Sequence, residues 1–87
     1  MTKSEEAVQW FDRVLSKQIS LWDFSFDFGE WLAYENGDEL EKENEKLFDL
    51  LNDFLPDKLE ELDSYELEDN RSWLEEYRNK SKKLIEK

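Results

Sequence analysis

Residues 21–35 constrain the fold of this 87-residue chain more than any other segment. At helical spacing, one apolar stripe comprises Leu21, Phe24, Phe28, Trp31 and Leu32. A second stripe on nearly the opposite side comprises Trp22, Phe26, Gly29 and Ala33. A helix that is apolar almost all round is usually buried among several others. We therefore expect the central core helix of a helical bundle here. The alternative is a second stripe that is partly exposed for a partner.

Start signals place two helices in the first part of the chain. Ser4 is a candidate N-cap for a helix that runs to about Lys17. Ser20 is a better candidate for the helix over 21–35, because Asp23 three residues later nearly completes a capping box. The inward residues of the first helix are expected to be Ala7, Val8, Phe11, Val14 and Leu15, with Trp10 at the edge.

A third helix is expected between a glycine and a proline. Gly37 is placed to adopt the left-handed conformation after the second helix, and Asp38 to cap the third. Pro56 disfavours helix at the residue before it, so this helix should end near Phe54, with an acidic connection over residues 57–69. Its inward stripe comprises Leu40, Leu47, Phe48, Leu51 and Phe54.

Asp69 or Asn70 is expected to cap a final helix. Its inward residues are Trp73, Leu74, Tyr77, Leu84 and Ile85. Short connections after the first two helices favour antiparallel neighbours. The sequence thus predicts a single all-α domain over residues 1–87, a small antiparallel four-helix bundle.

Charge is concentrated in the middle of the chain. The whole sequence has 24 Asp and Glu against 12 Lys and Arg, a net of −12. Residues 35–69 alone carry fifteen acids and three lysines, a net of −12, whereas residues 71–87 carry a net of +3. Mutual repulsion among so many carboxylates works against a compact fold. Solvation of helix faces explains individual charges, but it does not explain this surplus.

Several classes of function lack their usual residues. The sequence has no His and no Cys, the residues that most often serve as general bases, nucleophiles and transition-metal ligands. Its two glycines form neither a phosphate-binding loop nor a calcium loop. We expect no enzyme, no cofactor and no metal site. A net of −12 argues against nucleic-acid binding, and no apolar run approaches the ~20 residues of a membrane span. The N-terminus does not resemble a signal peptide, so a soluble, cytoplasmic protein is expected.

An acidic surface without catalytic groups is suited to binding a basic protein. Nucleases have strongly basic clefts, and an array of carboxylates can occupy such a cleft in place of phosphates. Tight binding also requires a few desolvated anchors, for which aromatic side chains are favoured. Tyr65 in the acidic connection and Trp22 on the second stripe are the candidate anchors.

Two stretches resemble the immunity proteins of the colicin D type. Residues 17–24 (KQISLWDF) are similar to the stretch that opens the second helix in that family. Residues 54–57 (FLPD) and 65–70 (YELEDN) are similar to the region between its third and final helices. The order of these stretches, the chain length and the acidity agree with the family.

The resemblance implies a four-helix bundle that binds a tRNA-cleaving toxin and covers its basic active site, with carboxylates in place of tRNA phosphates. The matching acids are Asp53 and Asp57, followed by Glu60, Glu61 and Asp63. The full expected toxin-binding set is Asp49, Asp53, Asp57, Glu60, Glu61, Asp63, Tyr65, Glu66 and Glu68. Relatives also serve contact-dependent inhibition systems, so the toxin need not be a colicin.

Two other functions are compatible with the same residues. One is a nucleic-acid mimic that inhibits a different nuclease or a DNA-binding protein. The other is a helical adaptor that binds a partner helix through the second aromatic stripe. Salt separates the adaptor from the two acidic inhibitors, because attraction between exposed charges is screened over about 8–10 Å at physiological ionic strength.

Overall fold

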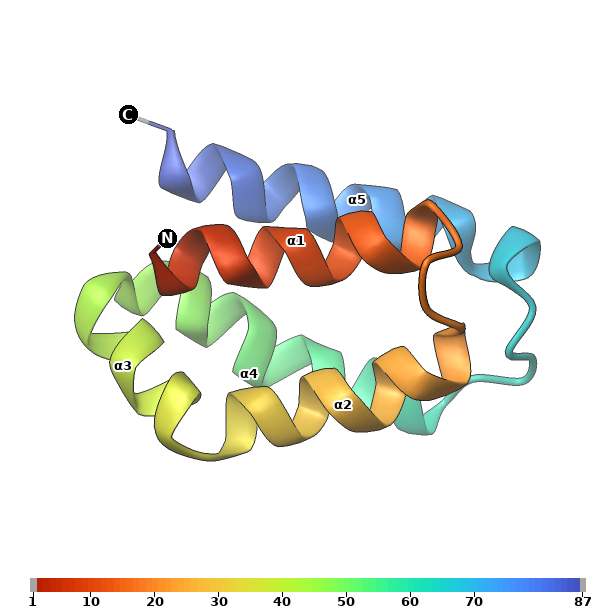
Figure 1. Cartoon of the computed structure of the whole chain (residues 1–87), viewed down its shortest axis with the longest axis horizontal. Helices are drawn as coiled ribbons and strands as arrows, with labels where there is room; N and C mark the ends of the chain where they lie inside the picture. Colours follow the sequence, from red (N-terminus) through yellow and green to blue (C-terminus); the bar gives the residue numbers. More distant parts are fainter. Residues whose placement is uncertain (1, 87) are drawn as a thin grey trace.

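The computed structural model of this chain describes residues 2–86, except for the side chains of residues 35 and 54–56. The described residues form five α-helices and no β-strand, which confirms the all-α prediction (Figure 1). The helices are α1 (Lys3–Leu15), α2 (Leu21–Ala33), α3 (Glu35–Glu43), α4 (Glu45–Glu60) and α5 (Leu67–Ile85).

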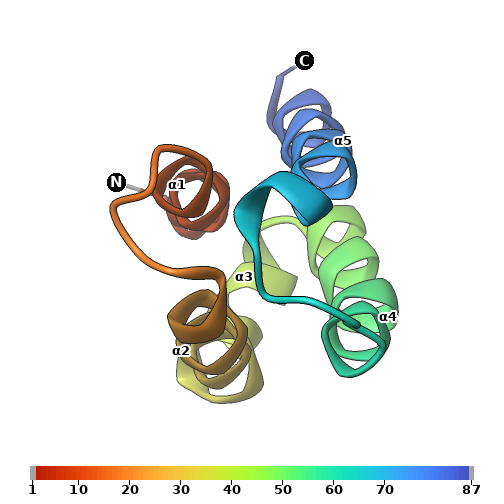
Figure 2. The same ribbon diagram turned by 90° about the vertical axis from the view of Figure 1, so that its right-hand side faces the viewer.

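The helices form a small bundle of two layers (Figures 1 and 2). One layer contains α1 and α5, which are antiparallel and share the most extensive contact in the molecule. The other layer contains α2 and α4, which touch each other at few positions. α3 connects α2 to α4 at the end of the bundle where both termini lie (Figure 1). Residues 61–66 cross the opposite end (Figure 2). The α2–α4 layer therefore has an outer face with little contact between its two helices.

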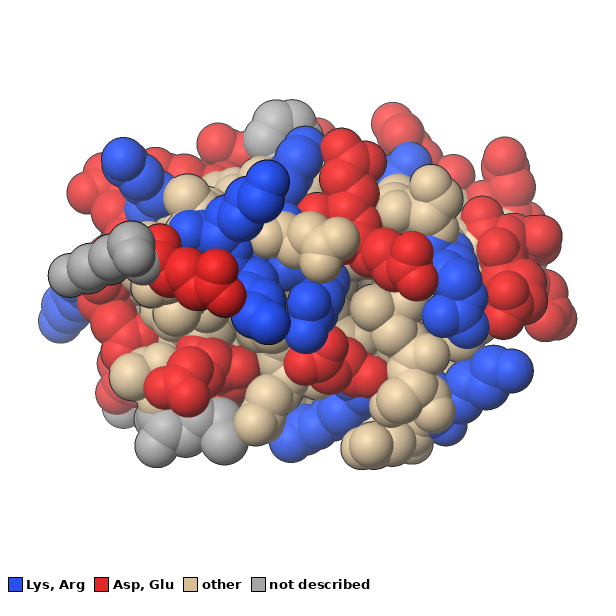
Figure 3. Space-filling model, turned by 90° about the horizontal axis from the view of Figure 1, so that it is seen from above, with Lys and Arg blue, Asp and Glu red and all other residues tan. Residues whose placement is uncertain are grey.

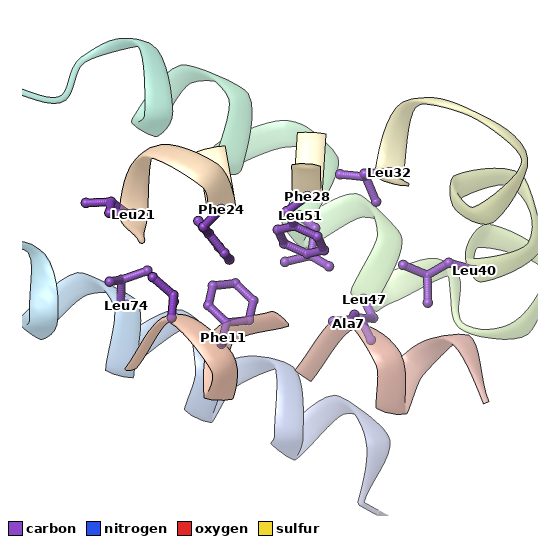
Figure 4. Close-up of a cluster of buried hydrophobic side chains, with 11 residues drawn as sticks. Ala7, Phe11, Leu21, Phe24, Phe28, Leu32, Leu40, Leu47, Leu51 and Leu74 are labelled. Atoms are coloured by element: carbon purple, nitrogen blue, oxygen red, sulfur yellow. The ribbon is translucent and has the colours of Figure 1, made fainter. Parts of the chain in front are cut away.

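A cluster of apolar side chains fills the core between the layers (Figure 4). Its buried members are Ala7, Phe11, Val14, Leu21, Phe24, Phe28, Leu32, Leu40, Leu47, Leu51 and Leu74. Trp73, Tyr77, Leu84 and Ile85 of α5 pack against it while partly buried. Most of the predicted inward residues are thus in the core or against it; the predicted burial of Phe54 lies outside the described side chains.

The predicted third helix is two helices, because the chain leaves helical geometry at Asn44 (φ −153°, ψ 85°). The Asn44 side chain accepts a hydrogen bond from the Leu47 N–H at 3.1 Å and so caps α4. Its Nδ2 donates to the Leu84 carbonyl oxygen at 3.1 Å. Asparagine side chains compete with helical backbone hydrogen bonds. Here the hydrogen bond to the Leu84 carbonyl oxygen, at the end of α5, stabilises the non-helical conformation of Asn44.

Pro56 does not end α4, so the predicted stop near Phe54 was wrong. The helix continues to Glu60, and the Glu61 N–H donates to the Asp57 carbonyl oxygen at 3.1 Å. A proline inside a helix removes one hydrogen bond and costs about 3 kcal/mol. Leu59 and Leu62 pack against the core just beyond it. Burial of these two side chains offsets that cost.

The predicted cap positions at three helix starts were also wrong. Asp38 lies inside α3 and does not precede it. Thr2, not Ser4, caps α1, and Glu66 precedes α5 in place of Asp69 or Asn70. Ser4 and Asn70 are buried instead. The Asn70 amide donates to the carbonyl oxygen of Glu66 at 2.8 Å, within its own turn. The Ser4 Oγ donates to the Glu43 carboxylate at 2.7 Å, so both buried polar side chains are hydrogen-bonded within the fold.

Gly37 lies inside α3 and does not adopt the expected left-handed conformation. Among the described residues, only Lys17 has a positive φ, of 66°. Glycine is required at position 37 because the backbone of α2 approaches α3 closely there. A Cβ at this position would overlap the backbone carbonyl oxygen of Leu32, at the end of α2. The absence of a side chain lets α3 fold back against α2.

The start of α1 is joined to α3 by hydrogen bonds. The Glu43 carboxylate accepts from the Ser4 N–H at 2.8 Å and from the Ser4 Oγ at 2.7 Å. Lys3 forms an ion pair with Glu39 at 3.4 Å. Desolvation raises the pKa of Glu43, but the bonds from Ser4 and the charge of Lys3 together outweigh it. The pKa therefore lies below its ordinary value.

The two glycines provide a matched pair of variants. We expect Gly37→Ala to destabilise the fold by about 1–3 kcal/mol, because the added methyl forces α2 and α3 apart. Gly29→Ala should instead stabilise it by about 0.5–1 kcal/mol, because its Cβ meets nothing within 4 Å and alanine favours helix. Urea unfolding of both variants measures the difference. Equal effects of the two substitutions would contradict this account of Gly37.

Glu43 predicts a pH dependence of stability. A carboxylate with a lowered pKa stabilises the fold above its unfolded pKa, ordinarily 4.5, and this contribution is lost as the pH falls through the folded pKa. Glu43→Gln should therefore lower Tm by a few °C near pH 7, and the gap from wild type should close as the pH falls from 4.5 through the folded pKa. Thermal unfolding across this range tests it. Glu41→Gln, an exposed acid on the same helix, should follow the wild-type curve. A gap that is independent of pH would contradict the assignment.

Candidate functional site

The second apolar stripe of α2 is on the surface, so the expectation that α2 is buried all round was wrong. Ser20 caps α2 as predicted, with its Oγ accepting from the Asp23 N–H at 3.0 Å. The first stripe faces the core, whereas Trp22 is 51% exposed and Phe26 is 55% exposed. The bundle contacts α2 from one side only. The structure agrees with the alternative, in which the second stripe is partly exposed.

An exposed aromatic cluster links α2 to the connection between α4 and α5. It comprises Trp22, Phe26 and Tyr65. The ring centroid of Trp22 lies 4.9 Å from that of Phe26 and 4.9 Å from that of Tyr65, both edge to face. Tyr65 is itself 44% exposed. The two rings singled out in the sequence are therefore in contact, and they hold residues 61–66 against α2.

Beside this cluster, a groove of about 470 Å³ runs between α2 and α4. Its lining is mainly apolar and comprises Ser25, Phe26, Gly29, Leu32, Ala33, Asn52, Leu59, Glu60 and Tyr65. Another hollow, of about 660 Å³, lies along α1 and is lined mostly by polar residues. The α2–α4 groove is the one that adjoins the predicted binding residues.

The structure brings most of the predicted binding acids onto the α2–α4 layer or the end beside it. Asp49, Asp53, Asp57 and Glu60 are exposed on one face of α4. At 1.5 Å per residue, Asp49 lies about 12 Å along the helix from Asp57. The remaining exposed acids, at the connection that crosses the end of the bundle, are Glu61, Asp63 and Glu66.

Glu68 differs from the other predicted binding residues because it has a partner within the chain. Its carboxylate accepts from Arg71 Nε at 3.3 Å and from Arg71 Nη2 at 3.0 Å. This bidentate contact lowers the pKa of Glu68. The charge of Glu68 is thus partly neutralised before any partner arrives.

Three acids of α2 were not predicted: Asp23, Asp27 and Glu30, which are exposed. At about 100° per residue they lie roughly 100–160° round the helix from the groove-lining stripe, on the side of α2 away from the groove. The acids of α4 border the groove instead, with Glu60 in its lining. None of the three acids of α2 has an ion pair among the described residues. The sequence carried one indication of this: residues 18–41 contain no Lys or Arg.

Ion pairs are confined to the rest of the molecule. Among residues 2–86, every ion pair joins residues of α1, α3 or α5, or the residue that follows α5. Figure 3 shows the α1–α5 layer from outside, where basic and acidic side chains alternate. α2, α4 and residues 61–66 together carry eleven acids and two lysines, a net of −9. We call these eleven acids the acidic surface: Asp23, Asp27, Glu30, Glu45, Asp49, Asp53, Asp57, Glu60, Glu61, Asp63 and Glu66.

No candidate metal site was found in the part of the chain that the structure describes, where no three carboxylates are grouped to hold an ion. None of the described helices is both long enough and apolar enough to cross a bilayer. Comparisons with protein-family models, with curated proteins and with solved structures found no match for this chain.

The acidic surface should reduce the stability of the fold. We expect the double variant Asp53→Asn with Asp57→Asn to raise Tm by roughly 2–4 °C, because it relieves repulsion without removing an ion pair. The matched control is Glu75→Gln with Glu76→Gln on α5, which changes net charge equally but removes pairs to Arg71 and Lys80.

The control should leave Tm unchanged or lower it. Thermal unfolding at low salt compares the two double variants directly. A rise in Tm for the α5 variant equal to that for the α4 variant would show that only total charge matters.

Proposed function

We propose that this protein inhibits a basic nuclease toxin by covering its active site, in the manner of the immunity proteins that its sequence resembles. One observation carries the proposal: eleven acids on α2, α4 and residues 61–66 face outward without ion pairs among the described residues. A surface that reduces stability and has no internal partner is suited to an external one of opposite charge.

Regular spacing on α4 supports this role. Asp49, Asp53 and Asp57 follow one another at intervals of four residues, about 6 Å along the helix axis. A row of evenly spaced negative charges is what a nucleic-acid strand presents to the lysines and arginines of its enzymes. The inhibitor would occupy the toxin stoichiometrically, in the cytoplasm, and would perform no chemistry itself. The partner that the sequence resemblance implies is a tRNA-cleaving toxin.

The exposed aromatic cluster favours a second candidate, a helical adaptor that binds a partner mainly through apolar contact. Trp22 and Phe26 are each more than half exposed, and aromatic anchors dominate many protein interfaces. The two candidates differ in the effect of salt. An acidic inhibitor should associate much more slowly at high ionic strength, whereas apolar docking should change little.

The direct test is co-expression with the toxin domain encoded beside this gene, together with binding of the purified proteins. Cells should be protected, and the complex should form fastest at low salt. Asp53→Asn with Asp57→Asn should slow association roughly 3–10-fold, because steering depends on the local field. Glu75→Gln with Glu76→Gln should leave the association rate nearly unchanged.

Stopped-flow association rates at several salt concentrations provide the measurement. Absence of both protection and binding at low salt would refute the proposal. Equal slowing by the two double variants would move the binding surface away from α4.

A further inference from the structure

The groove between α2 and α4 is the feature of the acidic surface that charge alone does not explain. Leu32 and Leu59 of its lining are buried or partly buried, whereas Phe26 and Tyr65 are about half exposed. Keeping large apolar side chains in contact with water costs free energy. Its volume of about 470 Å³ lies within the range of pockets that hold small molecules.

The polar groups at the groove are suited to a cation. Glu60 lines it and has no ion pair among the described residues, and no Lys or Arg is in the lining. Lys58, two residues before Glu60, lies over the Trp73 ring at 5.7 Å and is thereby held against α5. Ser25 donates its hydroxyl hydrogen to the Trp22 carbonyl oxygen at 2.7 Å. The carboxylate of Glu60 is thus open to an external base.

A second copy of this chain is a poor occupant. The face that contains the groove carries a net of −9, and two such faces would repel each other across the interface. A partner with lysines or arginines around an apolar side chain meets both requirements, because Glu60 lines the groove and the other exposed acids of α4 lie on the adjoining face of that helix. Charge complementarity therefore selects the chemistry of the occupant.

We propose that the groove holds one large apolar side chain of the basic partner, flanked in that partner by Lys or Arg residues. The identity of the partner rests on the proposed function, but the groove is testable without it. Exposed charges raise the rate of encounter and add little to the lifetime of a complex. A buried apolar anchor lengthens the lifetime. The acidic surface thus mainly determines the rate of association, and the groove mainly determines the rate of dissociation.

Two peptides of equal charge test the groove on its own. One has Trp between two pairs of Lys, and the other has Ser in place of Trp. The Trp peptide should bind at least about tenfold more tightly, with backbone NMR shifts at Gly29, Ala33 and Asn52, because it buries a large apolar side chain. Equal affinities, or shifts confined to other parts of the molecule, would overturn the proposal.

Gly29→Leu blocks the groove without removing a charge. A Cβ at Gly29 meets nothing within 4 Å, and leucine favours helix, so the variant should keep or exceed the wild-type Tm. It should bind both peptides with the affinity that wild type has for the Ser peptide. Tyr65→Ala, outside the helices, removes one side of the groove as a second variant. If the preference for Trp persists in both, the groove is not the site.

Sedimentation of the free protein tests the other possible occupant of the groove, a second copy of this chain. A monomer at every concentration is expected. A dimer that Gly29→Leu dissociates would overturn the proposal, because a second copy would then fill the groove.

Binding kinetics with the toxin domain distinguish a failure of the groove proposal from a failure of the proposed function. Gly29→Leu should raise the dissociation rate about tenfold and leave the association rate and its salt dependence unchanged. If the protein prefers the Trp peptide but does not bind the toxin, the proposed function is refuted and the groove proposal stands. Toxin binding with an unchanged dissociation rate in Gly29→Leu would overturn the groove and leave the function.

Discussion

The arrangement of this bundle depends on the packing of Phe28, a fully buried ring on α2. Its centroid lies 5.6 Å from those of Trp10 and Phe11 on α1, and 5.2 Å from that of Phe24 on α2 itself. Aromatic pairs at such distances contribute beyond the area they bury. The contact determines which side of α2 faces α1. Because α2 is apolar on two sides, burying the Phe28 side leaves the Trp22 side outside the core, and the groove and the aromatic cluster follow from this.

Charge is segregated between the same two layers. Most acids of the α1–α5 layer are paired with bases, and acidic and basic side chains are mixed on its outer side (Figure 3). The acids of the α2–α4 layer have no ion pairs among the described residues. Lys58, one of the two bases of α4, lies over Trp73 of α5 instead. Repulsion within the acidic surface lowers stability, and the basic partner that we propose would relieve it. Apolar contact and charge are thereby placed side by side on the outer face of α2 and α4.

Much of the fold could be predicted from local pattern. The all-α class, the Ser20 cap and most of the buried stripes depend on spacing along the chain, which the sequence displays directly. The acids of α4 were likewise within reach, and Trp22 and Tyr65 were each singled out, but their contact was not predicted. Errors arose where a distant group decides a local outcome. Asn44 breaks the predicted third helix because the Leu84 carbonyl oxygen accepts its amide hydrogen. α4 continues past Pro56, and Leu59 and Leu62 beyond it pack against the core while partly buried.

By itself, the amino-acid sequence determined a helical chain with two apolar stripes on one helix and a surplus of acid in its middle, because composition and periodicity are local properties. Only the tertiary structure decided which stripe is buried, because that depends on which helices lie beside α2. It also brought Tyr65 into contact with Trp22, which lies far from it in the sequence. The groove lies between two helices that touch at few positions, and a space between distant segments exists only once they have been packed together.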